Sequence, residues 1–288
     1  MLALSSLLWL ATWPFAASGS PLANTRKKND WSCTSAKHPN PVVLLHGMGA
    51  NDDLNFITME PWLQKQGFCT FSLTYGVTPP YPPFVGGLQP ISESSKEVAA
   101  FIRQVQQRTG AAKVDLVGHS EGAMQSLYVP KVQGVSSIVD NIVAIAPPTH
   151  GATASGFLTL VENIPFLTPD LRSKILDGVN CGMCKDVFAG GPFDKRLNDG
   201  QPVKQPGNKI TIITSRHDEA VTPTDTAFVY EDGVNNIYVQ DYCPLDIVGH
   251  LGEAVDLNVF NLILNSLENQ VGRKFTCSLV QVPVRRHL

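Results

Sequence analysis

Three side chains of this sequence have the types and the chain order that nucleophilic acyl transfer requires. Ser120 lies in the run GHSEG at 118–122, and Asp218 and His250 follow it in that order. A serine hydroxyl is a poor nucleophile until a neutral imidazole takes its proton. A carboxylate then orients the imidazole and stabilises its charged form. We therefore expect Ser120 as the nucleophile, His250 as the general base and Asp218 as the acid that orients the base.

The residues around Ser120 predict the turn that would expose its hydroxyl. An apolar strand, KVDLV at 113–117, runs into the pattern G-x-S-x-G, and apolar residues follow at helical spacing. In such a strand-to-helix turn the serine has a strained backbone. Gly118 and Gly122 leave room there for the neighbouring strand and helix. The pattern is typical of a nucleophile elbow.

Other residues could fill the acid and base positions. Glu219 and Asp225 are the rival acids, and Asp218 is preferred because of its place just past the predicted strand 209–214. His150 precedes every acid candidate, so it would break the order of nucleophile, acid and base in which this kind of site is built.

A second glycine-rich turn could stabilise the negative charge that develops on the substrate oxygen. The apolar strand 41–45 ends in the run HGMG at 46–49. The chemistry needs backbone N–H groups that point at the developing oxyanion. We expect these donors to be the N–H of Met48 and the N–H of Glu121, the residue after the nucleophile. The Glu121 carboxylate would repel an oxyanion, so we expect it to face away.

Strands and helices alternate along the chain on both sides of these residues. Predicted strands cover 41–45, 68–75, 113–117, 137–147, 209–214 and 236–241. Predicted helices cover 54–66, 91–109, the segment after Ser120 and 253–267. This alternation predicts an α/β fold with a mostly parallel central sheet and helices on both faces. The expected site residues follow predicted strands, at the edge where open α/β sheets carry their sites.

The regular alternation stops at 147, and we expect residues 150–207 to be an insertion in a catalytic domain that covers 33–288. Apolar residues within the insertion recur at helical spacing, at Phe157, Leu160 and Ile164 among others. An apolar insertion at this place could be a lid or an acyl-binding cap. The alternative is a helix packed permanently on the core, and the sequence does not separate the two.

Residues 1–20 have the pattern of a secretory signal peptide. The segment has no charged side chain, an apolar stretch and small residues at 16–19 that offer a cleavage site. Its apolar run is short and interrupted by polar residues, so an N-terminal membrane anchor is the weaker alternative. We expect a secreted, extracellular protein.

All six cysteines follow this segment, an even number that fits an oxidising compartment. The sequence alone does not determine their pairing. The set that joins sequence neighbours is Cys33–Cys69, Cys181–Cys184 and Cys243–Cys277. The alternative for the run CGMC at 181–184 is half of a zinc site, but no second CxxC motif completes it.

The 288 residues carry a formal net charge of −3, and 43% are hydrophobic and 16% charged. This composition is that of a globular protein and does not favour nucleic acid as a partner. We expect no cofactor and no metal, because Asp241 and Asp246 near His250 lack the oxygen-rich spacing of a calcium site. We expect a monomer that binds a lipid or a small ester, with a lipid–water interface as a place of action.

From 40 to about 267 the sequence resembles the class 2 family of secreted lipases, which have the α/β-hydrolase fold. The matching segments are PVVLLHGMGAN, GFCTFSLTYG, TGAAKVDLVGHSEGAM, IVAIAPPTHG, TSRHDEAVTP and CPLDIVGHLG. The resemblance implies a triacylglycerol lipase or carboxylesterase with Ser120, Asp218 and His250 as its triad. It also implies Met48 and Glu121 as oxyanion donors. One departure is Glu121 itself, where such lipases more often have glutamine.

Other functions of the same fold stay open at this stage. A phospholipase, a thioesterase or an acyltransferase could use the same site. A catalytically silent hydrolase fold that binds lipid is the alternative from another class, but such proteins usually lack a member of the triad. Residues 150–207 match the family least well, so the substrate preference is open.

Overall fold

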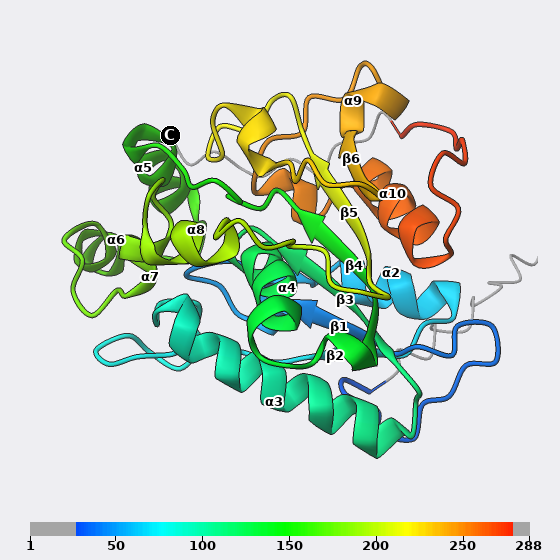
Figure 1. The fold of residues 1–288 in the computed structure, drawn as a ribbon. Helices are drawn as coiled ribbons and strands as arrows, with labels where there is room; N and C mark the ends of the chain where they lie inside the picture. The colour runs from blue at the N-terminus through cyan, green and yellow to red at the C-terminus, as the bar shows by residue number, and fades with distance from the viewer. Residues whose placement is uncertain (1–26, 279–288) are drawn as a thin grey trace, which may run out of the picture.

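The computed structural model describes residues 27–278, so the predicted signal peptide at 1–20 lies outside the described residues. In this part of the chain six strands form one parallel sheet in the order β2-β1-β3-β4-β5-β6. The strands are β1 (Val42–Leu45), β2 (Thr70–Ser72), β3 (Val114–His119), β4 (Val139–Ile145), β5 (Lys209–Thr214) and β6 (Val234–Tyr238). The predicted α/β fold with a parallel sheet is confirmed (Figure 1).

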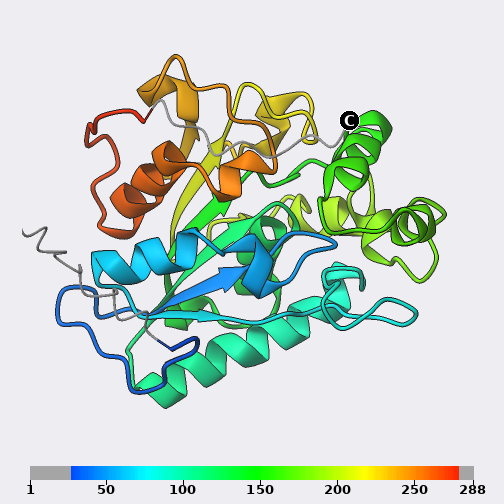
Figure 2. The same cartoon turned by 180° about the vertical axis from the view of Figure 1, so that it is seen from behind.

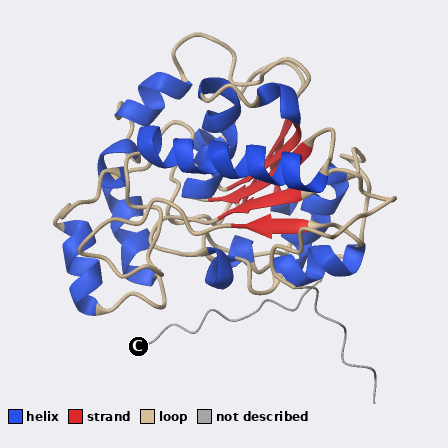
Figure 3. Cartoon of the chain, turned by 90° about the horizontal axis from the view of Figure 1, so that it is seen from below, coloured by secondary structure: helices blue, strands red, loops and turns tan. Residues whose placement is uncertain are grey.

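Side chains of the strands alternate between two apolar cores. Val43 and Leu45 of β1 belong to one core, together with α3 (Ile91–Thr109) and α4 (Glu121–Val132). Val42 and Leu44 belong to the other core, together with α2 (Met59–Gln66) and α10 (Leu257–Leu267). Because successive strand side chains point to opposite faces, a continuous apolar run fits a sheet that helices cover on both sides. Figure 2 shows α2 and α10 on the face turned away in Figure 1, and Figure 3 shows helices on both sides of the strands.

The predicted helix 54–66 is wrong in its bounds, because the chain forms two helices here. The side chain of Asn51 accepts a hydrogen bond from the N–H of Leu54 and so caps α1 (Asp52–Asn55). The chain then leaves the helix at Phe56, whose ring is buried in the core beside α2. A cap and a buried aromatic side chain therefore override the helical period that the sequence suggested.

Several predicted elements differ from the observed ones in where they begin or end. The strand expected at 236–241 ends at Tyr238, because Tyr238 and Asp241 form a capping box that starts α9 (Val239–Tyr242). The helix expected at 253–267 is a 3-10 turn, η3 (Gly252–Ala254), followed by α10, which Asp256 caps. The strands expected at 68–75 and 137–147 are shortened to β2 and β4, the latter after η1 (Ser136–Ile138).

The insertion contains four helices, at the end of the sheet toward which the strand arrows point (Figures 1 and 2). These are α5 (Ala154–Asn163), α6 (Pro169–Leu176), α7 (Met183–Asp186) and α8 (Pro192–Leu197). The α7 segment is tied to the start of α3, since the N–H of Met183 donates to the carbonyl of Leu88 just before that helix and Asp186 accepts from the N–H of Ile91, its first residue. Movement of α5 and α6 as a lid stays a prediction.

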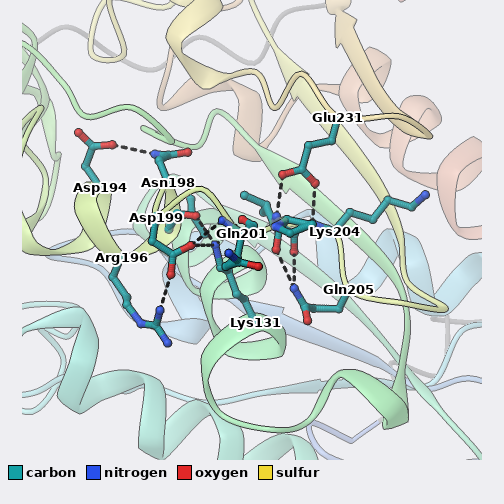
Figure 4. Close-up of polar contacts among 12 residues, drawn as sticks. Lys131, Asp194, Arg196, Asn198, Asp199, Gln201, Lys204, Gln205 and Glu231 are labelled. Atoms are coloured by element: carbon teal, nitrogen blue, oxygen red, sulfur yellow. Dashed lines mark hydrogen bonds and ion pairs between the residues drawn. The ribbon is translucent and has the colours of Figure 1, made fainter.

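The end of the insertion is anchored to α4 by Lys131 (Figure 4). Its ammonium donates to the carbonyl oxygens of Leu197 and Gln201 at 2.6 and 2.8 Å and pairs with Asp199 at 2.7 Å. These contacts use all three donors of the lysine. An open hollow of about 920 Å³ lies beside this loop, lined mostly by residues of 197–209. Its lining includes none of the expected site residues, so we do not assign it to the site.

The disulfides of the structure are the set that joins sequence neighbours, Cys33–Cys69, Cys181–Cys184 and Cys243–Cys277. The first joins the segment before β1 to the start of β2, and the third joins the end of α9 to the segment after α10. Within residues 27–278, no helix has both the length and the apolar character needed to cross a bilayer.

Candidate active site

Ser120 stands at the turn between β3 and α4, where the sequence predicts a nucleophile elbow. Its backbone has a φ of 56° and a ψ of −118°, a region that residues with a side chain rarely adopt. A Cβ on Gly118 would stand 2.1 Å from the carbonyl oxygen of Gly122, and a Cβ on Gly122 would stand 1.9 Å from that of Leu45. Only glycine fits at either position, so the G-x-S-x-G pattern has a steric cause in this fold.

The side chains of Ser120, His250 and Asp218 lie in one chain of hydrogen bonds. The Nε2 atom of His250 is 2.9 Å from Ser120 Oγ, and its Nδ1 atom is 2.8 Å from Asp218 Oδ2. All three side chains are buried. A neutral imidazole with its proton on Nδ1 donates to the carboxylate and accepts from the hydroxyl. This arrangement can take the hydroxyl proton while the serine oxygen attacks an electrophile.

The turn after β5 orients Asp218. Its Oδ1 atom accepts from the backbone N–H groups of Ala220 and Val221 at 2.8 and 2.9 Å, which leaves Oδ2 for His250. The rival acid Glu219 has a different contact, because its Oε2 accepts from the backbone N–H of His250 at 3.0 Å. The carboxylate that bonds Nδ1 of the imidazole is therefore that of Asp218.

The two ring nitrogens of His250 bond Asp218 and Ser120, and neither remaining rival is among their partners. Asp225 is in the 3-10 turn η2 (Thr224–Ala227), and His150 is exposed with its Nδ1 atom 2.9 Å from the carbonyl of Thr226. His217, next to Asp218, is exposed.

His119, the residue before the nucleophile, holds the backbone of the loop that carries His250. Its Nε2 atom lies 2.9 Å from the carbonyl oxygen of His250, to which it donates. Burial and the neighbouring His250 lower the pKa of His119 to about 3, so its ring stays neutral. Sequence reasoning missed this contact, because the two residues are 131 positions apart and only the folded sheet brings them together.

The charges around His250 favour its protonated form. Burial lowers the pKa of His250, but the charge of Asp218 and its hydrogen bond outweigh burial and raise the pKa above the ordinary 6.5. Behind this pair Glu253 is fully buried, and its Oε1 accepts from the N–H of Ser215 at 3.1 Å. Burial and the charge of Asp218 raise the pKa of Glu253 well above its ordinary value, which favours a neutral carboxyl there. The sequence contained no signal that Glu253 would be a buried, neutral carboxyl beside Asp218.

The N–H groups of Met48 and Glu121 are free to bind an oxygen. Both residues border the same cavity as Ser120. Within residues 27–278 neither N–H has a hydrogen-bond partner, whereas those of Gly47 and Gly49 on either side of Met48 are both bound. The two expected oxyanion donors therefore border the cavity at Ser120 without a hydrogen-bond partner among the described residues, which leaves them available to a bound oxygen.

Two apolar cavities meet at Ser120 and Met48. A narrow one passes beneath α5 at Phe157, and a wider one of about 150 Å³ runs along Ile164 toward the segment after His250. Leu160 of α5 borders both cavities. The apolar residues that predicted a helix in the insertion thus form walls of the site.

The part of the chain that is described contains no group of three or more His, Cys, Asp or Glu side chains arranged to hold a metal ion. Of the two carboxylates considered for calcium, Asp241 pairs with Arg216, and Asp246 accepts from Asn258.

The sheet, the elbow and the Ser120–His250–Asp218 contacts define a class of protein, the α/β-hydrolase fold with a serine presented to a histidine. The model of one protein family, described as Lipase (class 2), matches residues 39–252. The chain belongs to the class 2 lipase family.

Relatives of known annotation match only a part of this chain. A triacylglycerol lipase of Pseudarthrobacter phenanthrenivorans is 28% identical over 121 residues, which are 41% of this chain and 36% of that protein. A triacylglycerol lipase of Burkholderia plantarii is also 28% identical over 121 residues, 41% of this chain and 32% of that protein. The matches therefore span about a third of the length of these relatives.

Among solved structures, lipase B of Aspergillus fumigatus superposes with a TM-score of 0.61. The two chains are 20% identical, and the superposition covers 79% of this chain and 52% of that one. At this identity the likeness supports the α/β-hydrolase fold and nothing finer.

Proposed function

We propose that this chain is a secreted carboxylic ester hydrolase that acts on lipids, as a triacylglycerol lipase or a carboxylesterase. The observation that carries the proposal is the line of contacts from Ser120 through His250 to Asp218, beside the free N–H groups of Met48 and Glu121. Membership of the class 2 lipase family supports a lipid ester as the substrate.

The first half of the reaction transfers the acyl group to the protein. Ser120 Oγ attacks the carbonyl carbon of the ester, and the hydroxyl proton passes to His250 Nε2. The carbonyl oxygen becomes negative and accepts hydrogen bonds from the N–H groups of Met48 and Glu121. As the carbon–oxygen bond to the alcohol breaks, His250 returns the proton to the departing oxygen.

The second half restores the serine. A water molecule gives a proton to neutral His250 as its oxygen attacks the acyl carbon, and the negative oxygen again binds at Met48 and Glu121. The bond to Ser120 Oγ then breaks, and Oγ takes the proton back from His250. Asp218 stays ionised throughout and stabilises the imidazolium that forms in both halves.

The two cavities at Ser120 suit an acyl chain and an alcohol portion that are both apolar. The insertion contributes Phe157 and Leu160 of α5 and the following residue Ile164 to their walls. The insertion at 150–207 would then decide which acyl groups are accepted, as a lid or as a fixed cap.

The alternative of a silent lipid-binding fold has less support. It would not require Ser120, His250 and Asp218 to keep hydrogen-bond distances of 2.9 and 2.8 Å in a buried site. Three disulfides fit an oxidising compartment and so support secretion.

Labelling with a fluorophosphonate probe tests the nucleophile. We expect the wild-type protein to be labelled and Ser120→Ala not to be labelled. Ser126→Ala is the matched control, because its hydroxyl is buried on the same helix and bonds only the carbonyl of Ala123 among the described contacts. Absence of labelling in the wild type, or its persistence in Ser120→Ala, would exclude the proposed mechanism.

Hydrolysis of an ester series of rising chain length, below and above substrate aggregation, tests the substrate class. A jump in rate at the lipid–water interface supports a lipase with a moving lid. Rates that fall steadily with chain length support a carboxylesterase. Preference for a thioester, a phospholipid or an acceptor alcohol over water would support the corresponding alternative.

A further inference from the structure

The carboxyl group of Glu121 is buried directly behind the candidate oxyanion hole. Its Oε1 atom accepts from the side-chain amide of Gln125 at 2.9 Å, and its Oε2 atom lies 2.6 Å from the hydroxyl oxygen of Tyr75. A Cβ on Gly87 would stand 2.9 Å from Oε2 and 3.0 Å from the Cα of Met48. The carboxyl therefore lies close beneath the turn that carries Met48.

The hydroxyl of Tyr75 has two oxygen neighbours but only one proton. It lies 2.6 Å from the carbonyl oxygen of His46 and 2.6 Å from Glu121 Oε2. A carbonyl oxygen can only accept, so the tyrosine proton must go to His46 if that contact is a hydrogen bond. The contact with Glu121 can then be a hydrogen bond only if Oε2 carries a proton and donates it to Tyr75. Two buried contacts this short therefore require a neutral carboxyl on Glu121.

The same tyrosine determines how the Met48 peptide is aimed. The backbone N–H of Tyr75 donates to His46 Nε2 at 3.2 Å, which leaves the imidazole proton on Nδ1. Nδ1 then donates to the carbonyl oxygen of Gly47 at 2.8 Å. In a trans peptide the N–H points opposite to the C=O. The carbonyl of Gly47 and the N–H of Met48 belong to one peptide, so this bond turns the Met48 N–H away from His46.

We propose that Glu121 is held as a neutral carboxylic acid and is a positioning residue, which through Tyr75 and His46 aims the Met48 N–H at the oxyanion. The inference rests on the proposed function, because it concerns the same reaction. The side chain of the residue after the nucleophile thus orders one oxyanion donor, while the backbone of that residue supplies the other.

The electrostatic surroundings agree with a neutral carboxyl. Burial outweighs the contacts with Tyr75 and Gln125 and raises the pKa of Glu121 to about 7, and the charges of Asp186 on α7 and Glu97 on α3 raise it further. Burial lowers the pKa of His46 to about 4, so the imidazole brings no positive charge toward the carboxyl.

Loss of the Glu121 proton should switch the oxyanion hole off. An ionised carboxylate would attract the Tyr75 proton, because hydrogen bonds to charged acceptors are stronger. The His46 carbonyl would then face a hydroxyl oxygen without a hydrogen. A negative charge beside the developing oxyanion would also oppose the reaction. Together these effects should lower kcat/KM on the alkaline side of neutral pH by on the order of tenfold or more.

The test compares pH profiles of kcat/KM, each scaled to its own maximum. Glu121→Gln keeps the contacts without an ionisable proton, since its amide can donate to Tyr75 and its carbonyl can accept from Gln125. We expect its profile to lack the alkaline fall of the wild type. Asp115→Asn is the matched control, because it removes a different buried carboxyl at the opposite end of β3. In this control kcat/KM should still fall on the alkaline side, as it does in the wild type.

An unchanged alkaline fall in Glu121→Gln would overturn the inference. A second readout needs no activity. The infrared spectrum of wild-type protein with isotope-labelled glutamate, minus that of Glu121→Gln labelled in the same way, should contain a protonated buried carboxyl at slightly acid pH that disappears in mildly alkaline buffer. The subtraction removes the signal of Glu253, whose buried carboxyl is also held neutral. Absence of that band would also overturn the inference. A band in a protein that hydrolyses no ester would instead sustain the neutral Glu121 and refute the proposed function.

Discussion

Replacing Glu121 by glutamine should remove a pH dependence of the free energy of unfolding. Burial is the main cause that raises the pKa of Glu121 from 4.5 to about 7 in the folded protein. Between these values the folded protein keeps a proton that the unfolded chain has released, so a rise in pH favours unfolding. The stability that this proton confers is full below pH 4.5 and is lost as the pH rises through about 7.

The size of the effect follows from the shift in pKa. One unit corresponds to about 1.4 kcal/mol, so a rise from 4.5 to about 7 predicts a loss of roughly 3 kcal/mol. The side chain is fully buried, so solvent screening does not reduce this figure. Glutamine has no such proton. The unfolding free energy of Glu121→Gln minus that of the wild type should therefore grow by roughly 3 kcal/mol across the window.

Urea unfolding at a series of pH values, with the disulfides intact, measures this difference. Other titrating groups are shared by both proteins and cancel. Asp115→Asn is again the control, because burial raises the pKa of Asp115 from 3.8 to about 6. Its stability relative to the wild type should grow by a similar amount, but over a window that ends about one unit lower.

Two results would refute the reasoning. A difference between Glu121→Gln and the wild type that stays constant from below pH 4.5 to above pH 7 would mean that Glu121 is ionised in the fold. Glu121 would then not donate a proton to the hydroxyl of Tyr75. If the stability difference from the wild type grew over the same pH window in Glu121→Gln and in Asp115→Asn, the titration would report some other group.

Three further predictions concern the elbow, a disulfide and the base. Gly122→Ala should abolish ester hydrolysis and disrupt folding, because its Cβ would stand 1.9 Å from the carbonyl oxygen that ends β1; a soluble, active variant would contradict this. Replacing Cys33 and Cys69 by alanine should lower the free energy of unfolding in urea by about 4 kcal/mol, since their bond spans 36 positions. On the acid side of the wild-type profile, kcat/KM should rise with pH as His250 loses its proton, with a midpoint above 6.5; full activity well below that pH would argue against His250 as the base.

Matched variants separate these effects from general damage. Gly110 has a φ of 69°, but a Cβ there would meet nothing within 4 Å, so Gly110→Ala should lower the free energy of unfolding by only about 1–2 kcal/mol. The Cys181–Cys184 bond spans 3 positions, so its removal should lower the free energy of unfolding by about 2 kcal/mol, less than removal of Cys33–Cys69. Equal losses for the two disulfides would show that loop closure is not the main source of their stabilisation.

Helix and strand bounds show where local sequence information ends. The helix at 91–109 is as predicted, because a long amphipathic period is a strong local signal. The break between α1 and α2 depends on burial of Phe56, and the end of β6 depends on a capping box at Tyr238. Such ends are decided by contacts with the rest of the fold, which periodicity does not contain.

The candidate site divides in a similar way. The sequence by itself determined the elbow at Ser120, the chain order of Asp218 and His250, and the glycine-rich turn at Met48. These are local patterns, each tied to a strand end, and parallel strands bring their carboxyl ends to one edge. Their residue types follow from the chemistry of acyl transfer and from the space that a tight turn allows.

Only the tertiary structure decided which buried polar groups support them. The contact of His119 with His250 and that of Tyr75 with His46 and Glu121 join residues far apart in the chain. None has a sequence signature, because a buried hydrogen bond depends on where the packed elements leave two polar atoms. The protonation of Glu121 belongs to this second group, since burial among particular neighbours, and not residue type, determines whether a carboxyl keeps its proton.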